Sequence, residues 1–75
     1  MLKVECVDFE VVKDLSNRED LVFNSLMFLE DHDMSVKVEE LLENIKEVHN
    51  EDMTEQELQE IIQKLEDLNY IKEKV

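Results

Sequence analysis

The 75-residue sequence contains neither glycine nor proline. These two residues dominate tight turns and most linkers, so the turns have to be formed by Asn, Asp, Ser and His, and the chain has no flexible segment of the usual composition. A chain of this length without a linker is expected to form one small domain, spanning residues 1–75.

Cysteine and long apolar runs are also scarce. Cys6 is the only cysteine, so no disulfide can form within the chain, although a bridge to another chain stays open. A single thiol is typical of a reducing cytoplasm. The segment MLKVECVDFE lacks the apolar run of a signal peptide, and no window approaches the length of a membrane span. We therefore expect a cytoplasmic protein that does not contact the membrane.

Positive charge is the third scarcity. The chain has 21 acidic and 8 basic residues, which gives a formal charge of −13, and Arg18 is the only arginine. This charge repels nucleic acid and anionic membranes, so direct nucleic-acid binding is not expected. It favours cations or the basic surface of another protein as partners. The alternative is that the acidity only confers solubility, because charged runs are usually solvated faces.

Three helix starts stand out, with Ser16, Ser35 and Thr54 as their N-cap residues. Glu19 and Glu57 follow the first and the third at the spacing of a capping box. Val38 stands at that place after Ser35 and cannot complete the box. The sequence thus predicts three helices within residues 16–69.

The second and third helices each carry one apolar stripe with the same spacing. The residues expected to be buried are Val38, Leu41, Leu42, Ile45 and Val48 in the second helix, and Leu58, Ile61, Ile62, Leu65 and Leu68 in the third. The two helices are therefore expected to pack side by side on a shared core.

The first helix is apolar around almost its whole circumference in the run LVFNSLMFL, residues 21–29. Such a helix is central to its domain or is buried against another chain. Cover from the N-terminal segment and a homodimer are both open at this point. The side chains expected at a dimer interface are Leu21, Phe23, Met27 and Phe28.

Both ends of the chain are predicted to be extended. Apolar residues alternate through Leu2, Val4 and Cys6, and the alternation then shifts by one position, which indicates a bulge or a strand buried on both faces within residues 1–12. Asn69 can take the left-handed conformation that closes a helix, and a second strand is expected over residues 70–75. We expect the two short strands to pair.

The third helix ends in LEDLNYI, and the segment from about residue 16 to residue 75 resembles the winged-helix class of helix-turn-helix domains. In that class the third helix commonly ends in Leu-x-x-Leu-Gly-(aromatic or aliphatic)-Ile and continues into a wing strand. The matching residues here are Leu65, Leu68, Asn69, Tyr70 and Ile71, with Asn in place of Gly. The resemblance implies a mainly α (α+β) domain of three helices with short N- and C-terminal strands.

The same resemblance places the exposed face of the third helix at the DNA-binding position. The residues at that face are Glu55, Gln56, Gln59, Glu60, Gln63 and Asp67. Glutamines can contact adenine, but no Lys or Arg stands beside them to hold phosphates. The sequence also stops at Val75, before a second wing strand. The resemblance therefore implies a domain that binds protein instead of DNA.

We predict that the partner binds along the second helix, the turn after it and the third helix. The residues of this acidic surface are Glu39, Glu43, Glu47, Glu51, Asp52, Glu55, Gln59 and Gln63. The first three form a carboxylate ladder, in which one carboxylate follows another about every 6 Å along a helix. That pitch approximates the spacing of phosphates along a nucleic-acid strand.

The ladder leads to a specific hypothesis, namely a regulator that occupies the basic, nucleic-acid-binding groove of another protein. Acidic inhibitors of phage or plasmid origin and small acidic antirepressors are similar in this respect. The alternatives are an adaptor subunit of a larger complex and a DNA-binding winged-helix transcription regulator.

Catalysis and metal binding are not expected. Asp31, Asp33 and Ser35 open like a calcium loop, but Val36 replaces its glycine and Leu42 its last carboxylate. The histidines, at positions 32 and 49, do not have the spacing of a metal site. No nucleophile, base and phosphate loop assemble in the sequence, so we expect a non-enzymatic protein without a cofactor.

Overall fold

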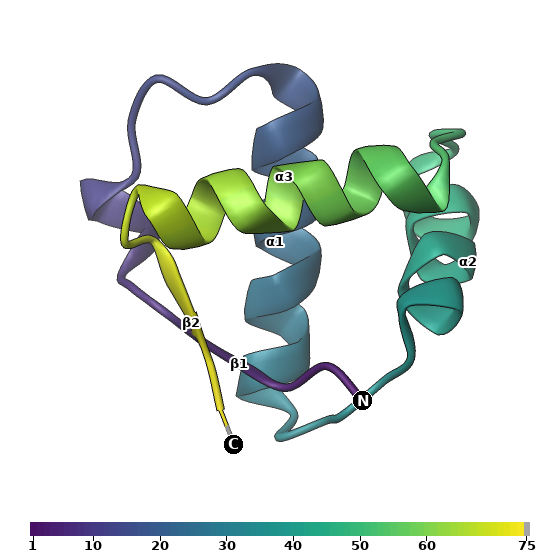
Figure 1. Cartoon of the computed structure of the whole chain (residues 1–75), viewed down its shortest axis with the longest axis horizontal. Helices are drawn as coiled ribbons and strands as arrows, with labels where there is room; N and C mark the ends of the chain where they lie inside the picture. Colours follow the sequence, from purple (N-terminus) through teal and green to yellow (C-terminus); the bar gives the residue numbers. More distant parts are fainter. Residues whose placement is uncertain (75) are drawn as a thin grey trace.

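The structure is a computed structural model that describes residues 1–74, in which three α-helices are framed by two short strands (Figure 1). The elements in chain order are β1 (Val4–Cys6), the 3-10 helix η1 (Phe9–Val11), α1 (Asn17–Asp31), α2 (Val38–His49), α3 (Glu55–Asp67) and β2 (Ile71–Glu73). The predicted mainly α, α+β class with a short strand near each end is confirmed.

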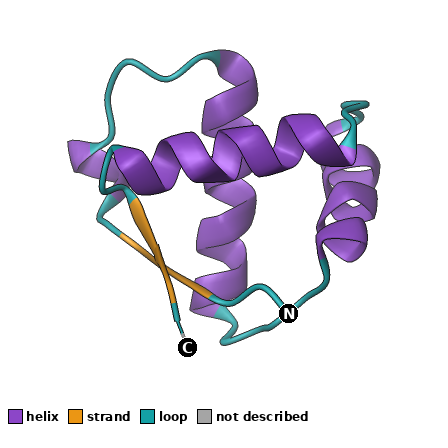
Figure 2. Ribbon diagram, in the orientation of Figure 1, coloured by secondary structure: helices purple, strands orange, loops and turns teal. Residues whose placement is uncertain are grey.

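The two strands form an antiparallel pair, as predicted (Figure 2). Cys6 lies opposite Ile71, and Val4 lies opposite Glu73. The segment before β1 also forms an isolated bridge to the connection between α1 and α2, where the Leu2 and Val36 backbones exchange hydrogen bonds of 2.6 and 3.1 Å. The N-terminal segment therefore ties β2 to the middle of the chain.

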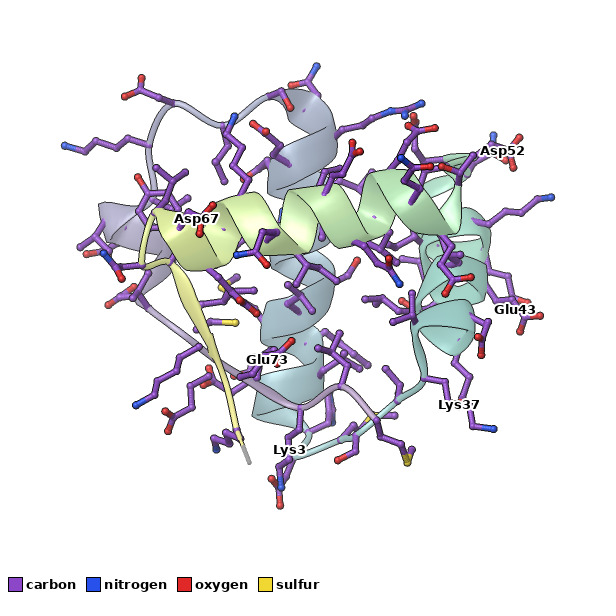
Figure 3. The ribbon with its side chains drawn as sticks, viewed as in Figure 1. Lys3, Lys37, Glu43, Asp52, Asp67 and Glu73 are labelled. Atoms are coloured by element: carbon purple, nitrogen blue, oxygen red, sulfur yellow. The ribbon has the colours of Figure 1, made fainter. Side chains whose placement is uncertain are left out.

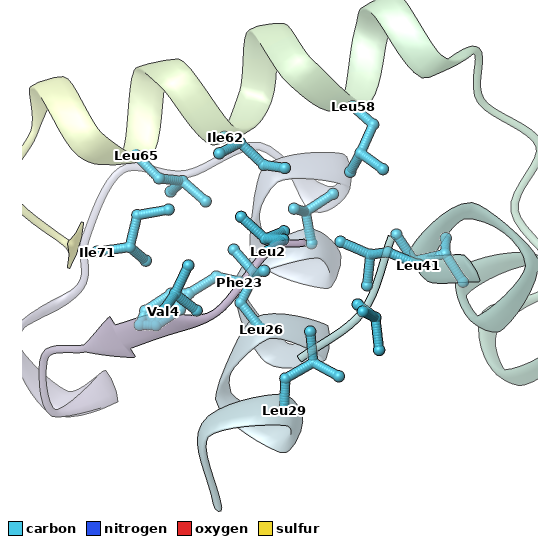
Figure 4. Close-up of a cluster of buried hydrophobic side chains, with 13 residues drawn as sticks. Leu2, Val4, Phe23, Leu26, Leu29, Leu41, Leu58, Ile62, Leu65 and Ile71 are labelled. Atoms are coloured by element: carbon cyan, nitrogen blue, oxygen red, sulfur yellow. The ribbon is translucent and has the colours of Figure 1, made fainter. Parts of the chain in front are cut away.

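Helix α1 lies at the centre of the molecule, where it passes behind α3 and is flanked by α2 and β1 (Figure 1). It contributes Val22, Phe23, Leu26 and Leu29 to the core. The other buried apolar residues are Leu2, Val4, Val36, Leu41, Ile45, Leu58, Ile62, Leu65 and Ile71 (Figure 4). Cover from the N-terminal segment, one of the two possibilities left open by the sequence, is thus part of how α1 is buried.

Two of the three expected helix caps are confirmed. At α1, Ser16 Oγ accepts from the Glu19 N–H at 3.3 Å and Glu19 Oε1 accepts from the Ser16 N–H at 2.9 Å, which is a complete capping box. At α3, Thr54 Oγ1 accepts from the Glu57 N–H at 3.1 Å. The Glu57 carboxylate accepts a hydrogen bond from the Thr54 hydroxyl instead of from the Thr54 backbone N–H, so only half of the capping box forms.

The expected cap of α2 at Ser35 is wrong. The bridge to Leu2 keeps Val36 extended, so the helix begins at Val38 and Lys37 becomes its N-cap residue. Glu40 Oε1 accepts from the Lys37 N–H at 3.2 Å, which is one half of a capping box, and a lysine side chain has no acceptor with which to form the other half. A tertiary contact, not the local sequence, sets this helix start.

Aspartate and asparagine take the positions that glycine usually fills. The residues with positive φ are Asp14, Asp33, Asn50 and Asn69. At the end of α3, Asn69 has φ 61°, its N–H donates to Glu66 O, and the Tyr70 N–H donates to Leu65 O, both at 2.9 Å. This is a Schellman motif, and it confirms that Asn69 closes the helix.

Four details of the sequence-based prediction are wrong. Val48 and Leu68 are 65% and 44% exposed, because each lies at the end of its apolar stripe, beyond the reach of the core. The N-terminal strand does not bulge within residues 1–12; it ends at Cys6, and the chain then forms η1 with Phe9 exposed. The C-terminal strand, expected over 70–75, covers only Ile71–Glu73, and Val75 lies outside the described residues.

Within residues 1–74, no helix combines the length and the apolar character that crossing a membrane requires.

Candidate functional site

The carboxylate ladder lies on the side of α2 that faces solvent. Leu41 and Ile45 turn toward the core, whereas Glu39, Glu43 and Glu47 are all exposed. In Figure 3 the Glu43 side chain points away from the body of the molecule. Among residues 1–74, no Lys or Arg forms an ion pair with any of the three carboxylates.

The lysine nearest the ladder in sequence is directed elsewhere. Lys46 Nζ lies 3.4 Å from Asp52 Oδ1, in the turn between α2 and α3. Both side chains are largely exposed, so this pair contributes little stability. Its main consequence is that the ladder has no counter-ion from its own helix.

Arg18 holds the turn between α2 and α3 against the start of α1. Its Nε donates to Glu51 Oε1 at 3.1 Å and one terminal nitrogen donates to Asp52 O at 3.2 Å, while the other pairs with Glu57. The predicted partner residue Glu51 is thus engaged within the chain. The acidic surface thus consists of a ladder that has no counter-ion among residues 1–74 and a turn that Arg18 binds to the rest of the fold.

Three shallow depressions are lined by residues of the acidic surface. Glu39 and Glu55 line one of about 360 Å³, and Glu43 lines another of about 210 Å³ together with Glu51 and Asp52. The third, of about 340 Å³, is lined by Gln59 and Gln63 and also by Glu66 and Glu73. Glu39, Glu55, Gln59 and Gln63 thus lie along two depressions that share Leu2, Val38 and Glu73, whereas Glu43, Glu51 and Asp52 line a separate one.

The polar face of α3 is engaged in hydrogen bonds along its own helix. Gln59 donates to Glu55 at 3.4 Å, Gln56 donates to Glu60 at 3.4 Å, and Gln63 donates to Asp67 at 3.0 Å. The lysine of this helix, Lys64, pairs with Glu19 of α1 at 2.7 Å. No cation of α3 is thus left on this face to bind a phosphate.

The Lys64–Glu19 contact also shows how the carboxylates near helix starts are stabilised. Hydrogen bonds from the Lys64 side chain and from the Ser16 backbone lower the pKa of Glu19. The Glu19 side chain is only 13% exposed, so it belongs to the contact between α1 and α3.

The four residues expected at a dimer interface lie in different surroundings. Phe23 is 2% exposed and packs inside the core, so its assignment to an interface is wrong. Leu21 and Met27 are half-buried against the same core. Phe28 alone is open to solvent, at 50% exposure.

A groove of about 690 Å³, which no sequence pattern predicts, lies between the ends of α1 and α3 and the two strands. Cys6, Glu30, Glu66 and Glu73 line it. Cys6 and Glu30 are distant in sequence from Glu66 and Glu73, and the tertiary packing of β1, α1, α3 and β2 brings the four together. No local pattern could have indicated this groove.

Burial and neighbouring carboxylates raise the pKa of two groups that line this groove. Burial, with the charges of Glu30 and Asp31, raises the pKa of the Cys6 thiol to about 12. Burial and the neighbouring Glu73 and Asp67 raise the pKa of Glu66 as well. The Cys6 thiol is therefore not a nucleophile at neutral pH.

No cluster suited to a metal ion occurs among residues 1–74. His32 is the C-cap residue of α1 and its ring contacts that of Phe28, with the two ring centres 4.3 Å apart and the planes inclined at 45°. His49 is the last residue of α2. In the segment that opens like a calcium loop, Asp33 pairs with Lys3 at 2.9 Å. This contact lowers the pKa of Asp33.

Helix α3 closes at Asn69 and the chain then enters β2, which is the local arrangement expected from the LEDLNYI motif. Membership of that class stays a prediction. In comparisons with known proteins, no family model, no curated protein and no solved structure matches the chain.

Proposed function

We propose that the protein is a small, acidic, non-enzymatic regulator that binds the basic surface of another protein. The observation that carries this proposal is the carboxylate ladder of α2, which is exposed and has no internal counter-ion among the described residues. The remaining acidic surface continues from it across the turn to α3.

The energetics of the ladder support a role in binding. Like charges four residues apart on a helix destabilise it by roughly 0.2–0.5 kcal/mol per pair. No ion pair among residues 1–74 offsets this repulsion, and Lys46, next to Glu47 in sequence, pairs with Asp52. A basic partner surface removes the repulsion on binding and also accelerates association through long-range attraction.

The sharper version of the proposal is a mimic of nucleic-acid charge. The ladder presents carboxylates about 6 Å apart on a rigid helix, which suits a groove built to hold consecutive phosphates. On this proposal the protein acts in the cytoplasm as an inhibitor or antirepressor of the phage or plasmid type, by occupying the nucleic-acid site of its target.

Direct DNA binding is the weaker alternative. The glutamines at the corresponding face of α3 are bonded to acidic neighbours, and Arg18, Lys46 and Lys64 are all engaged with carboxylates. An adaptor subunit is favoured by a different observation, the exposed Phe9 and Phe28 side chains.

The test compares capture of partners from a lysate of the source cells. The ladder variant Glu39→Gln, Glu43→Gln, Glu47→Gln is expected to lose a basic, nucleic-acid-handling partner that the unmodified chain retains at low salt and releases at moderate salt. The matched control, Glu10→Gln, Asp14→Asn, Glu60→Gln, changes the net charge equally at exposed positions and should keep the partner.

Competition then separates the versions of the proposal. Duplex DNA that displaces the chain from its partner supports the charge mimic. A partner retained equally by the ladder variant contradicts the proposed surface. Salt-sensitive binding of the chain itself to duplex DNA supports the DNA-binding alternative.

A further inference from the structure

A small apolar groove lies between α1 and α2, on the flank of α2 next to the ladder. Its volume is about 220 Å³, and its lining residues are Asn24, Ser25, Phe28, Asn44, Val48 and His49. Small-molecule pockets usually range from about 300 to 1,000 Å³, so this groove is too small for a typical cofactor and suits a single large side chain.

The groove displays apolar surface that the fold leaves uncovered. Phe28 and Val48 are 50% and 65% exposed, although both belong to helices whose other large apolar residues are mostly covered. The Phe28 ring contacts the ring of His32, with the two ring planes inclined at 45°. Asn24 and Asn44 provide amide groups at the rim, without a formal charge.

The charges around the groove select its occupant. Helical spacing places Asp20 and Asp31 within a turn of the groove residues on α1, and Glu40 and Glu47 within a turn of them on α2; all four are exposed. No Lys or Arg lines the groove. A second copy of this chain brings the same net charge of −13 and is repelled, whereas a cationic chain is attracted.

We propose that this groove receives one apolar anchor side chain from a cationic amphipathic helix of the partner. The Lys and Arg residues beside the anchor then lie against the flanking carboxylates and the ladder. This inference rests on the proposed function and adds to it: the charges attract the partner, and the anchor between Phe28 and Val48 fixes where it binds. Buried apolar anchors commonly dominate the affinity of such interfaces.

The probes are two synthetic peptides. One is an amphipathic helix of Leu and Lys, and the other has the same lysines with every Leu replaced by Gln. Binding is measured by titration calorimetry, and the contact surface by amide chemical-shift changes in the labelled protein. The Gln peptide reports electrostatic attraction alone, so loss of its binding in the ladder variant tests the proposed function independently of the groove.

We expect the Leu peptide to bind more tightly than the Gln peptide and to shift the amides of Phe28, Asn44 and Val48. Phe28→Ser and Val48→Ser should each remove most of this difference, about tenfold in affinity. Phe9→Ser changes an equally exposed apolar residue of η1 and should have no effect. Thermal unfolding shows whether each variant keeps its fold.

Two results overturn the groove assignment. One is that the Leu peptide binds no better than the Gln peptide, or binds equally well to the Phe28 and Val48 variants. The proposed function is then still supported if the ladder substitutions weaken binding of the Gln peptide. The other is a concentration-dependent dimer that Phe28→Ser dissociates, which makes a second copy the occupant. If neither peptide binds at millimolar concentration, both proposals fail.

Discussion

At the scale of single residues, the fold depends on side chains that replace glycine at left-handed positions. Asn and Asp tolerate this backbone conformation better than other residues with a side chain, because their short polar groups bond locally. Asn69 is the most consequential of them, since it turns the chain from α3 into β2 and lets Ile71 enter the core. A sequence without glycine can thus still end its helices sharply.

Asn69 therefore offers a test at this scale. Asn69→Val should lower the free energy of unfolding by about 1–2 kcal/mol, because a β-branched residue is strained at φ 61°. Asn69→Gly should leave it unchanged or raise it by up to about 1 kcal/mol. Urea denaturation measures both, and equal stabilities for the Val and Gly variants would contradict the assigned conformation.

At the scale of secondary-structure elements, the first residue of a helix is set by local hydrogen bonds in α1 and α3 and by a tertiary contact in α2. Ser16 and Thr54 cap their helices through bonds to residues three positions on, and the sequence predicted both correctly. Ser35 has the same residue type but is displaced from the cap position, because Val36 is drawn into a bridge with Leu2. A residue of N-cap type therefore does not cap a helix where the neighbouring backbone is hydrogen-bonded to a distant segment.

Alanine substitutions at the three positions check this distinction. Ser16→Ala and Thr54→Ala should each destabilise the protein by about 1 kcal/mol, since each removes an acceptor for a backbone N–H. Ser35→Ala should change the stability by less than about 0.5 kcal/mol, as an exposed surface substitution does. A large loss at Ser35, measured by thermal or urea unfolding, would mean that it caps α2 after all.

At the scale of the whole molecule, the net charge of −13 opposes compactness. Part of the repulsion is relieved by ion pairs between elements, such as Arg18 with the turn after α2 and Lys64 with Glu19 of α1. The ladder has no such relief among the described residues. The repulsion among the ladder carboxylates is therefore the part of the electrostatic repulsion that a basic partner, or dissolved salt, can reduce.

The ladder variant should accordingly be as stable as the unmodified protein or more stable, by a few tenths of a kcal/mol for each repulsive pair removed. The difference should shrink between low salt and about 0.15 M salt, where screening acts within about 8 Å. Thermal unfolding at the two salt concentrations measures it. A less stable ladder variant would show that these carboxylates hold the fold together.

Much of the fold was predictable because it follows from local patterns. The helical period placed Leu41, Ile45, Leu58, Ile62 and Leu65 on buried faces, and the structure agrees. The stripe could not show that Val48 and Leu68 extend past the core, because that depends on where α1 crosses the other helices. The same limit applies to Phe23 and Phe28, which are alike in sequence but lie inside and outside the core.

The sequence by itself determined the class of the fold, the positions of the helices and the sign of the molecular surface, because periodicity, caps and charge are properties of neighbouring residues. Only the tertiary structure decided which carboxylates are engaged and which stand alone. Arg18 reaches Glu51 and Glu57 across more than thirty residues of sequence, and Phe28 and Val48 meet at one groove from two helices. Such contacts depend on how the helices cross, which no short stretch of sequence specifies.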